Sequence, residues 1–354
     1  MNLIEYFNKG CKNDNLLGLE LEHFIVDKQK NSVPYPKVKE ILEKLAPLYG
    51  KPIYLDNNII GIEALNANIT LEPAAQLEIS IGPFKEIIDI KNKYDSFIKT
   101  IKPILDSFDY SLEYAGFLPK STIDDLPMIP KQRYTTMYNY FGKYGKYMMK
   151  GTASTQVSID YKSEDDFHKK FRVANILSPL FALICDNTRV LNGKPYNNHL
   201  ARTYIWNNVD HRPKFNPRDF NFREYAEYVY NTPLICMPDG LPTHKTAAEI
   251  YEDKPDIEHI LSMVFPDIRL KNCIEIRVAD SMPINRALEY IALIQGLFYN
   301  ERNLDMLYDL TKHINDISRA KNILIQYGKL GIVYDKSATE WIDLLYKIGG
   351  LNAI

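Results

Sequence analysis

The stretch TLEPAAQLEIS, residues 70–80, decides the fold because it is a strand pattern with an unusual polar side. Its aliphatic residues Leu77 and Ile79 alternate with polar ones, so the two kinds of side chain point to opposite faces of a strand. The segment places Glu72, Gln76 and Glu78 close together, and Gln76, Glu78 and Ser80 share one face of the strand. Lys or Thr would be usual on an exposed strand face, but these positions hold acids and an amide. Two interpretations therefore remain: a solvated sheet face, or the wall of a site that holds a cation.

The same two-sided pattern occurs in three other runs. Their aliphatic residues fit against a layer of helices, and their polar residues share the opposite face. The runs are GLELEHFIV (18–26), TASTQVSID (152–160) and CIEIRVA (273–279). The polar positions expected on one face are Gly18, Glu20, Glu22, Thr152, Ser154, Gln156, Ser158, Glu275 and Arg277. If the four runs share a sheet, these faces bring several carboxylates together.

Clustered carboxylates raise one another's pKa values unless a cation intervenes. Hard divalent cations prefer oxygen ligands, and Mg²⁺ commonly shares one or two carboxylates with substrate phosphates. The chain has no G-x-G-x-x-G and no Walker A sequence, so a nucleotide would be held by something other than those loops. The pattern therefore predicts ATP–Mg²⁺ on the sheet, while four ordinary solvent-facing strands remain the alternative.

Helical spacing of apolar residues separates these strands, without a regular βαβ order. Ser163 is expected to cap one helix, and the chain from about residue 283 is predicted to be mainly helical, with helix ends at Gly331 and Gly349. The three clearest helical stretches are residues 38–45, 90–108 and 167–184. Strands and helices mixed in this way predict an α+β fold with an antiparallel or mixed sheet.

Composition and charge narrow the classes of function. The 354 residues allow one large domain or two. The 43 Lys and Arg residues against 45 Asp and Glu give a net charge of −2, which argues against a nucleic-acid surface. We recognise no secretion signal, and the longest apolar run, residues 176–185, is shorter than the ~20 residues that span a bilayer. Four scattered cysteines favour free thiols in a reducing cytoplasm. Together with the charge balance and the short apolar runs, this leads us to expect a cytoplasmic protein that binds neither membrane nor nucleic acid.

Longer motifs extend the four runs in both directions. In chain order they are LIEYFNKGCK, GLELEHFIVD, ITLEPAAQLEIS, PKQRYTTMYNYFGKYG, MMKGTASTQVSIDY, RTYIWNNVD, FREYAEYVYNTPLI and FPDIRLKNCIEIRVADSMP. Through these motifs the chain resembles the plant-type glutamate–cysteine ligases, which are carboxylate–amine ligases with a glutamine-synthetase-like sheet. The resemblance implies a curved antiparallel or mixed sheet whose polar concave face is backed by helices. It also implies a single catalytic domain over residues 1–354.

The resemblance implies an ATP-dependent reaction on small molecules. ATP phosphorylates the γ-carboxylate of L-glutamate, and the amine of L-cysteine then attacks the γ-glutamyl phosphate. The products are γ-glutamylcysteine, an intermediate of glutathione biosynthesis, ADP and phosphate. ATP and Mg²⁺ are the implied cofactors, and we expect a monomer or a weak homodimer.

Roles for single residues follow from the same resemblance. Arg277 is expected to contact the transferred phosphoryl group, and Arg133 and Arg202 to grip substrate carboxylates, because a planar guanidinium pairs with a carboxylate at two points. The expected catalytic residues are Glu20, Glu72, Glu275 and Arg277. The expected metal ligands are Glu20, Glu22, Glu72, Glu78 and Glu275. The other expected contacts are Gln76 and Trp206 for substrate, and Gln156, Ser158 and Arg277 for the nucleotide.

Other interpretations of four of these residues stay open. Arg133 also fits a surface loop, and Arg202 fits an anchor for Asp210. Gln76 also fits a tie between two strands, and Trp206 fits the core.

The chain departs from the family's pattern near the expected substrates. Ala74-Ala75 and Ser281-Met282 stand where the family has Gly-Gly, and Gly151 stands where it has Arg. The run NNVD replaces Thr-Asp-Thr-Asp after the tryptophan. Two alternatives therefore remain: a ligase of the same fold that joins another acid or amine, and a nucleotide-binding homologue without catalysis.

Overall fold

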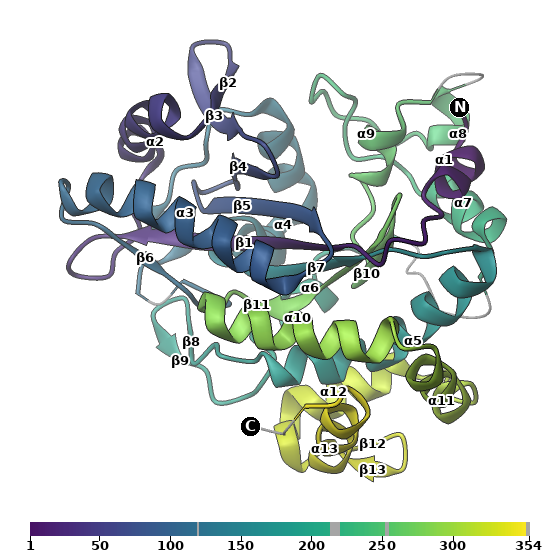
Figure 1. Ribbon diagram of the computed structural model, residues 1–354. Coiled ribbons are helices and arrows are strands. Elements are labelled where there is room, and N and C mark those ends of the chain that lie inside the picture. The colour runs from purple at the N-terminus through teal and green to yellow at the C-terminus, as the bar shows by residue number, and fades with distance from the viewer. Residues whose placement is uncertain (119, 213–219, 252–254, 352–354) are drawn as a thin grey trace.

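The computed structural model describes residues 1–118, 120–212, 220–251 and 255–351 (Figure 1). Within these ranges a sheet of nine antiparallel strands lies at the centre of the molecule. In spatial order its strands are β10 (Ile268–Leu270), β11 (Ile274–Asp280), β7 (Ser154–Ile159), β1 (Leu17–Val26), β5 (Leu77–Phe84), β4 (Ala67–Leu71), β3 (Asn58–Glu63) and β2 (Lys51–Leu55), and β6 (Ser111–Glu113) pairs with β1. The predicted α+β class with an antiparallel sheet is confirmed.

The four predicted strands are the neighbours β11, β7, β1 and β5, in the middle of the sheet. Their aliphatic faces form the core: Leu19, Leu77, Val157 and Ile276 are each at most 1% exposed. β7 begins at Ser154, two residues later than the expected run, because Thr152 caps the preceding helix and the Ala153 amide donates to the Gly116 carbonyl oxygen outside the sheet.

Helices cover the aliphatic face of the sheet. α5 packs on β11, α3 packs on β5, and α10 packs on β7. The helices are α1 (Leu3–Lys9), α2 (Tyr35–Tyr49), α3 (Ile87–Asp106), α4 (Gln132–Gly151), α5 (Glu164–Ile184), α6 (Ala201–Asn207), α7 (Phe222–Asn231), α8 (Ala247–Ile250), α9 (Ile257–Leu261), α10 (Ile284–Phe298), α11 (Glu301–Thr311), α12 (Ile317–Tyr327) and α13 (Ala338–Ile348). Two short hairpins join β8 (Val190–Leu191) to β9 (Lys194–Pro195) and β12 (Ile332–Val333) to β13 (Lys336–Ser337). Figure 1 places α11, α12 and α13 beyond α5 and α10, on the side away from the sheet.

The predicted helix ends agree with the structure, with one exception. Ser163 caps α5 by accepting a hydrogen bond from the Asp166 amide, and Gly349 caps α13. Gly331, however, follows a short 3₁₀ turn, and α12 ends at Gly328 instead. Gly328 has a φ of 53°, which a glycine adopts at little cost, so the chain turns there first.

A buried histidine joins the sheet to α3. The His23 side chain is fully buried, with Nδ1 3.0 Å from the Leu77 carbonyl oxygen and Nε2 2.8 Å from the Tyr94 hydroxyl. The Tyr94 hydroxyl lies 2.9 Å from that of Tyr114. Burial disfavours the imidazolium ion and lowers the pKa of His23 to about 4. His23 is therefore a neutral structural group at neutral pH.

One edge of the sheet is the strand β2, which is largely exposed. Ile53, Tyr54 and Leu55 are exposed apolar residues on it, and Lys51 and Pro52 precede them. Among the described residues no helix is long and apolar enough to cross a membrane. All four cysteines are free thiols.

Candidate active site

Strand register brings the polar residues onto one face of the sheet, opposite the helix layer. Glu20 on β1 lies opposite Ser80 on β5 and Gln156 on β7, and Glu22 lies opposite Glu78. Directly opposed residues of antiparallel strands point to the same face. The prediction that the polar residues of the four strands share one face of the sheet is therefore confirmed.

Glu20 and Glu72 are half-buried acids beside other acids. Burial raises the pKa of Glu20 to about 7, and the negative charges of Glu78 and Glu275 add to the shift. Burial also raises the pKa of Glu72 well above its usual value, with Glu78 and Glu22 contributing. Neither carboxylate makes a hydrogen bond or ion pair with any residue that the structure describes. Both are thus free to accept a ligand.

Glu22 and Glu78 are held by hydroxyl and amide donors. Glu22 accepts hydrogen bonds from the Ser154 amide at 2.7 Å, the Ser154 hydroxyl at 2.6 Å and Gln156 Nε2 at 3.1 Å. Glu78 accepts from the hydroxyls of Thr70 at 2.8 Å and Ser80 at 3.2 Å. Burial raises the pKa of both acids, although these hydrogen bonds oppose the shift. They fix the orientation of the two carboxylates.

Glu275 differs from the other acids because three cations surround it. Its carboxylate lies 2.5 Å from Arg269 Nε, 2.7 Å from Lys271 Nζ and 3.6 Å from Arg277 Nη1. Burial would raise its pKa, but the three positive charges, Arg269 first, lower it to about 2. Glu275 is therefore ionised and neutralised within the protein, and its role as a metal ligand stays a prediction.

Sequence reasoning missed Arg269 and Lys271. The signal was present, since the runs DIRL and CIEIRV are strand-like and separated by a few residues, which is typical of a hairpin. In that hairpin Arg269 lies directly opposite Glu275. Recognising β10 would have placed both cations beside the acid.

Arg277 brings a positive charge onto the acidic face. Its Nη1 donates a hydrogen bond to Gln156 Oε1 at 2.6 Å, and Gln156 in turn donates to Glu22. The side chain is 18% exposed, so the guanidinium is held yet still reachable. This is a suitable group for binding a phosphoryl oxygen.

The donor set fits a hard divalent cation bound together with a substrate. Among the described residues, no three His, Cys, Asp or Glu side chains form a ready-made metal centre. Mg²⁺ nevertheless commonly takes only one or two protein carboxylates and fills its other positions with water and phosphate oxygens. The unpartnered carboxylates of Glu20 and Glu72 match that requirement, and a bound cation would offset the burial and the repulsion by neighbouring acids that raise their pKa values.

A pocket of about 360 Å³ opens at one end of the polar face. It lies where the start of β1 meets the ends of β5 and β7. Glu20 and Ser158 contribute to its wall. The polar residues lining it are Lys12, Glu20, Asn66, Asn68, Ser80, Ser158, Asp160 and Asn272. Ser158, an expected nucleotide contact, thus borders a cavity of ligand size.

Gln76 binds the backbone in the structure. Its Oε1 accepts from the Ala74 amide at 2.9 Å, and its Nε2 lies 3.3 Å from the Met149 carbonyl oxygen and 3.1 Å from that of Thr152. Gln76 therefore ties the loop before β5 to the end of α4, rather than two strands. Its expected contact with substrate stays a prediction.

The two expected carboxylate-gripping arginines are also engaged with protein groups. Arg133 lies in the first turn of α4, not in a loop, and its two Nη atoms donate to the Ser262 hydroxyl at 2.9 Å and carbonyl at 3.0 Å. Arg202 donates to backbone carbonyls of β11. Asp210 is paired with Arg212 at 2.7 Å rather than with Arg202. The substrate roles of Arg133 and Arg202 stay predictions.

Lys131 and Trp206 flank the site in different ways. Burial lowers the pKa of Lys131, and the negative charge of the nearby Glu72 opposes that shift. Lys131 is thus a cation beside an expected metal ligand, and it was not predicted from the sequence. The Trp206 ring lies 6.0 Å from that of Phe265 and lines a small cavity beside Arg277. Trp206 is partly buried, which lies between the exposure expected of a substrate contact and that expected of a core residue.

Comparisons with known proteins place the chain in a family. The model of glutamate-cysteine ligase family 2 matches residues 16–341. The chloroplastic glutamate–cysteine ligase B of Oryza sativa subsp. japonica is 29% identical over 348 residues, covering 88% of this chain and 68% of that protein. The chloroplastic enzyme of Arabidopsis thaliana is 27% identical over 347 residues, covering 88% and 65%. A crystal structure of glutamate–cysteine ligase from Francisella tularensis in complex with AMP is similar with a TM-score of 0.46 and 12% identity, covering 96% of this chain and 78% of that one.

These names contradict the predicted cytoplasmic location, because the plant relatives are chloroplastic enzymes. The prediction was based on free thiols, which report a reducing environment and do not identify a compartment. The match over residues 16–341, together with the acidic sheet face built from the family's motifs, shows that the chain belongs to glutamate-cysteine ligase family 2.

Proposed function

We infer that this protein is an ATP-dependent ligase that joins the γ-carboxylate of L-glutamate to the amine of L-cysteine through a γ-glutamyl phosphate. The observation that carries this conclusion is the family match over residues 16–341. Relatives that cover 88% of the chain are named glutamate–cysteine ligases. We further propose that residues 1–354 act as one catalytic domain, because α5 and α10 join the sheet to the C-terminal helices.

The acids divide into two groups with different proposed tasks. Glu20 and Glu72, which have raised pKa values and no partner among the described side chains, would hold Mg²⁺ with help from Glu78. Bound Mg²⁺ would neutralise phosphate charge during phosphoryl transfer. Glu22 has a supporting task in this proposal, because it orients Gln156 through a 3.1 Å hydrogen bond. Glu275 keeps Arg269, Lys271 and Arg277 in place.

We propose that Arg277 binds the phosphoryl group as it moves from ATP to glutamate. Its guanidinium is fixed between Gln156 Oε1 and the Glu275 carboxylate, so little reorganisation is needed when charge develops on the phosphoryl oxygens. The nucleotide would occupy the pocket that Ser158 and Glu20 border. Its phosphates would then lie near the acids and Arg277.

Phosphate release tests the assignment. The purified protein should release phosphate from ATP only when glutamate, cysteine and Mg²⁺ are all present, with γ-glutamylcysteine as the product by mass spectrometry. Glutamate with hydroxylamine in place of cysteine should give a hydroxamate, because the amine intercepts the acyl phosphate. No hydroxamate and no glutamate-dependent phosphate release would refute activation of the γ-carboxylate.

One observation favours a second candidate, a ligase of the same fold that uses another amine. A Cβ at Gly151 would lie 2.3 Å from the Phe117 ring, so the aromatic ring fills the space where a larger residue would begin. The family pattern has Arg at this position, and we therefore expect the walls of the substrate site to differ here. A panel of amines assayed by mass spectrometry separates the candidates: cysteine should be the best acceptor if the first is correct, and another amine if the second is.

A further inference from the structure

A β-bulge interrupts the pairing of β11 with β7 at the catalytic face. The register shifts between Ile276 and Ala279, so that Arg277 and Val278 together lie opposite the single residue Gln156. Bulges of this kind re-aim side chains and are frequent beside active sites. Here the bulged residue is Arg277, whose Nη1 reaches Gln156 Oε1 at 2.6 Å.

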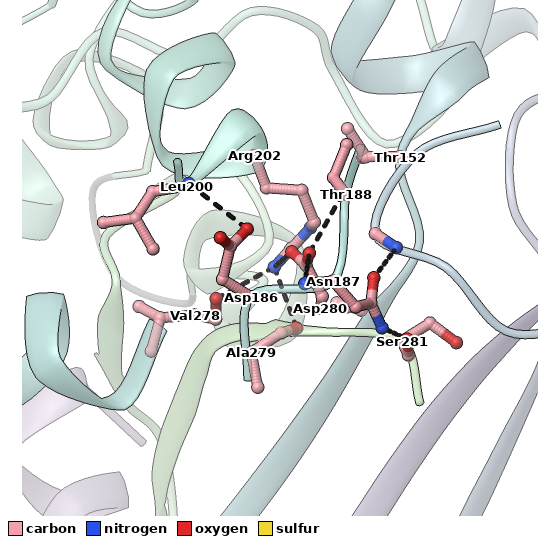
Figure 2. Close-up of polar contacts among 12 residues, drawn as sticks. Thr152, Asp186, Asn187, Thr188, Leu200, Arg202, Val278, Ala279, Asp280 and Ser281 are labelled. Carbon is pink, nitrogen blue, oxygen red and sulfur yellow. Dashed lines mark hydrogen bonds and ion pairs between the residues drawn. The ribbon is translucent and has the colours of Figure 1, made fainter. Parts of the chain in front are cut away.

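The guanidinium of Arg202 grips this bulge through its backbone. Nη1 donates to the carbonyl oxygens of Val278 at 3.1 Å and Ala279 at 2.9 Å, and Nη2 lies 3.4 Å from that of Arg277. Figure 2 shows Arg202 reaching from its helix to Val278 and Ala279. The carboxylate of Asp280 lies 4.0 Å from Nη1 and balances the charge. Arg202 is 6% exposed, so these contacts are made away from water.

Neighbouring residues hold both ends of this contact. Asp186 Oδ1 accepts a hydrogen bond from the Leu200 amide at 3.2 Å and so fixes the start of α6, which carries Arg202 (Figure 2). On the strand side, Thr188 donates to Asp280 at 3.0 Å, and Asn187 Nδ2 donates to the Ser281 carbonyl oxygen at 2.7 Å. The bulge is thus clamped between α6 and the segment 186–188.

We propose that Arg202 is a positioning residue: by holding the carbonyl groups of the β11 bulge, it sets Arg277 beside Gln156 for phosphoryl transfer. This differs from the expected grip on a substrate carboxylate, because both Nη atoms are already used on the protein backbone. The catalytic consequence rests on the proposed function. The structural part, in which Arg202 determines where Arg277 lies, does not.

The kinetic test compares Arg202→Met with Arg212→Met as the matched control. Arg212 is also a buried arginine that binds backbone carbonyls, those of Pro233 and Met263, but none on β11. Arg202→Met should lower kcat at least about tenfold, with a change in the KM for glutamate below about threefold. A rise in KM of about tenfold or more with kcat unchanged would overturn the proposal and return Arg202 to substrate binding.

A double-mutant cycle with Arg277→Lys provides the second readout. If Arg202 acts through Arg277, Arg202→Met should cost less than about threefold in kcat once Arg277 is replaced. Arg212→Met should have the same effect in both backgrounds. Equal losses from Arg202→Met with and without Arg277 would mean that Arg202 supports the fold alone, and would overturn the proposal. Should Arg202→Met fail to fold, Arg202→Lys, which keeps the charge but loses the fork, replaces it in the cycle.

A crystal structure separates this proposal from the proposed function. In the Arg202→Met or Arg202→Lys protein, the hydrogen bond between Arg277 and Gln156 should be lost while the remainder of the sheet is unchanged. Retention of that hydrogen bond and of the bulge would overturn the positioning role. A wild-type protein without ligase activity would instead refute the proposed function. The claim that Arg202 sets the position of Arg277 would still be tested by the crystal structure of the variant.

Discussion

Replacing Glu275 by Gln should destabilise the protein strongly, because it removes the counter-charge of three cations. The Glu275 carboxylate is 2% exposed and lies 2.5 Å from Arg269 and 2.7 Å from Lys271. Its pKa falls from 4.5 to about 2 in the fold. That difference of about 2.5 units corresponds to about 3 kcal/mol of preference for the ionised form. Glutamine keeps the shape but not the charge, so we expect a loss of about 3 kcal/mol in the free energy of unfolding.

The pH dependence of the wild type checks the sign. The folded pKa of Glu275 is depressed, so its contribution is fully present above about pH 4.5 and is lost as the pH falls toward about 2. The difference in stability between the wild type and Glu275→Gln should therefore shrink over that window. Urea denaturation followed by circular dichroism measures both proteins at each pH.

Glu20→Gln is the matched control, since it makes the same chemical change on the same sheet face. Burial and neighbouring acids raise the pKa of Glu20 to about 7, so its ionised form destabilises the fold. Neutralising it should leave stability unchanged or raise it by about 1–2 kcal/mol at pH 8, after allowance for its partial exposure. A Glu275→Gln variant that loses less than about 1 kcal/mol, or equal losses in both variants, would refute the electrostatic reasoning.

Three further predictions follow from single contacts. His23 has a folded pKa of about 4, below its usual 6.5, so the unfolded chain takes up a proton first and stability falls with pH. Relative to His23→Asn, the wild type should lose about 2 kcal/mol between pH 7.5 and pH 5, measured by urea denaturation. A Cβ at Gly116 would lie 2.1 Å from Asp280 Cγ, so Gly116→Ala should lower the melting temperature through this clash. Gly142→Ala is the control: its Cβ would meet nothing within 4 Å, so it measures only the cost of an alanine at a φ of 63°. ATP with Mg²⁺ should raise the melting temperature of the wild type more than ATP with a chelator, and Glu72→Gln should reduce that difference.

The alternation of side chains predicted the central sheet because it is a local property. Leu77 and Ile79 could only be buried on one face, and that placed Glu78 on the other. The order of the strands and the pairing of Glu20 with Gln156 depend on contacts between residues 136 positions apart, which no local pattern reports. The polar face was therefore predictable, and its register was not.

The arginines show where sequence reasoning ended. An arginine near an expected site invites a substrate role, but Arg202 binds carbonyl groups 76 and 77 positions away, and Arg133 binds Ser262, 129 positions away. A backbone carbonyl looks the same at every position in a sequence, so such partners cannot be read from it. The cations around Glu275 were predictable in principle, because Arg269, Lys271 and Glu275 lie within one hairpin.

The exposed edge at β2 has a practical consequence for handling this protein. Three exposed apolar side chains, Ile53, Tyr54 and Leu55, lie on an edge strand that pairs with β3 on one side only, and such edges are where chains start to pair with one another. Pro52 removes one amide donor from that edge and Lys51 adds a charge, and together they discourage a continuous ribbon between molecules. We therefore expect variants that replace either residue to aggregate more readily in concentrated samples.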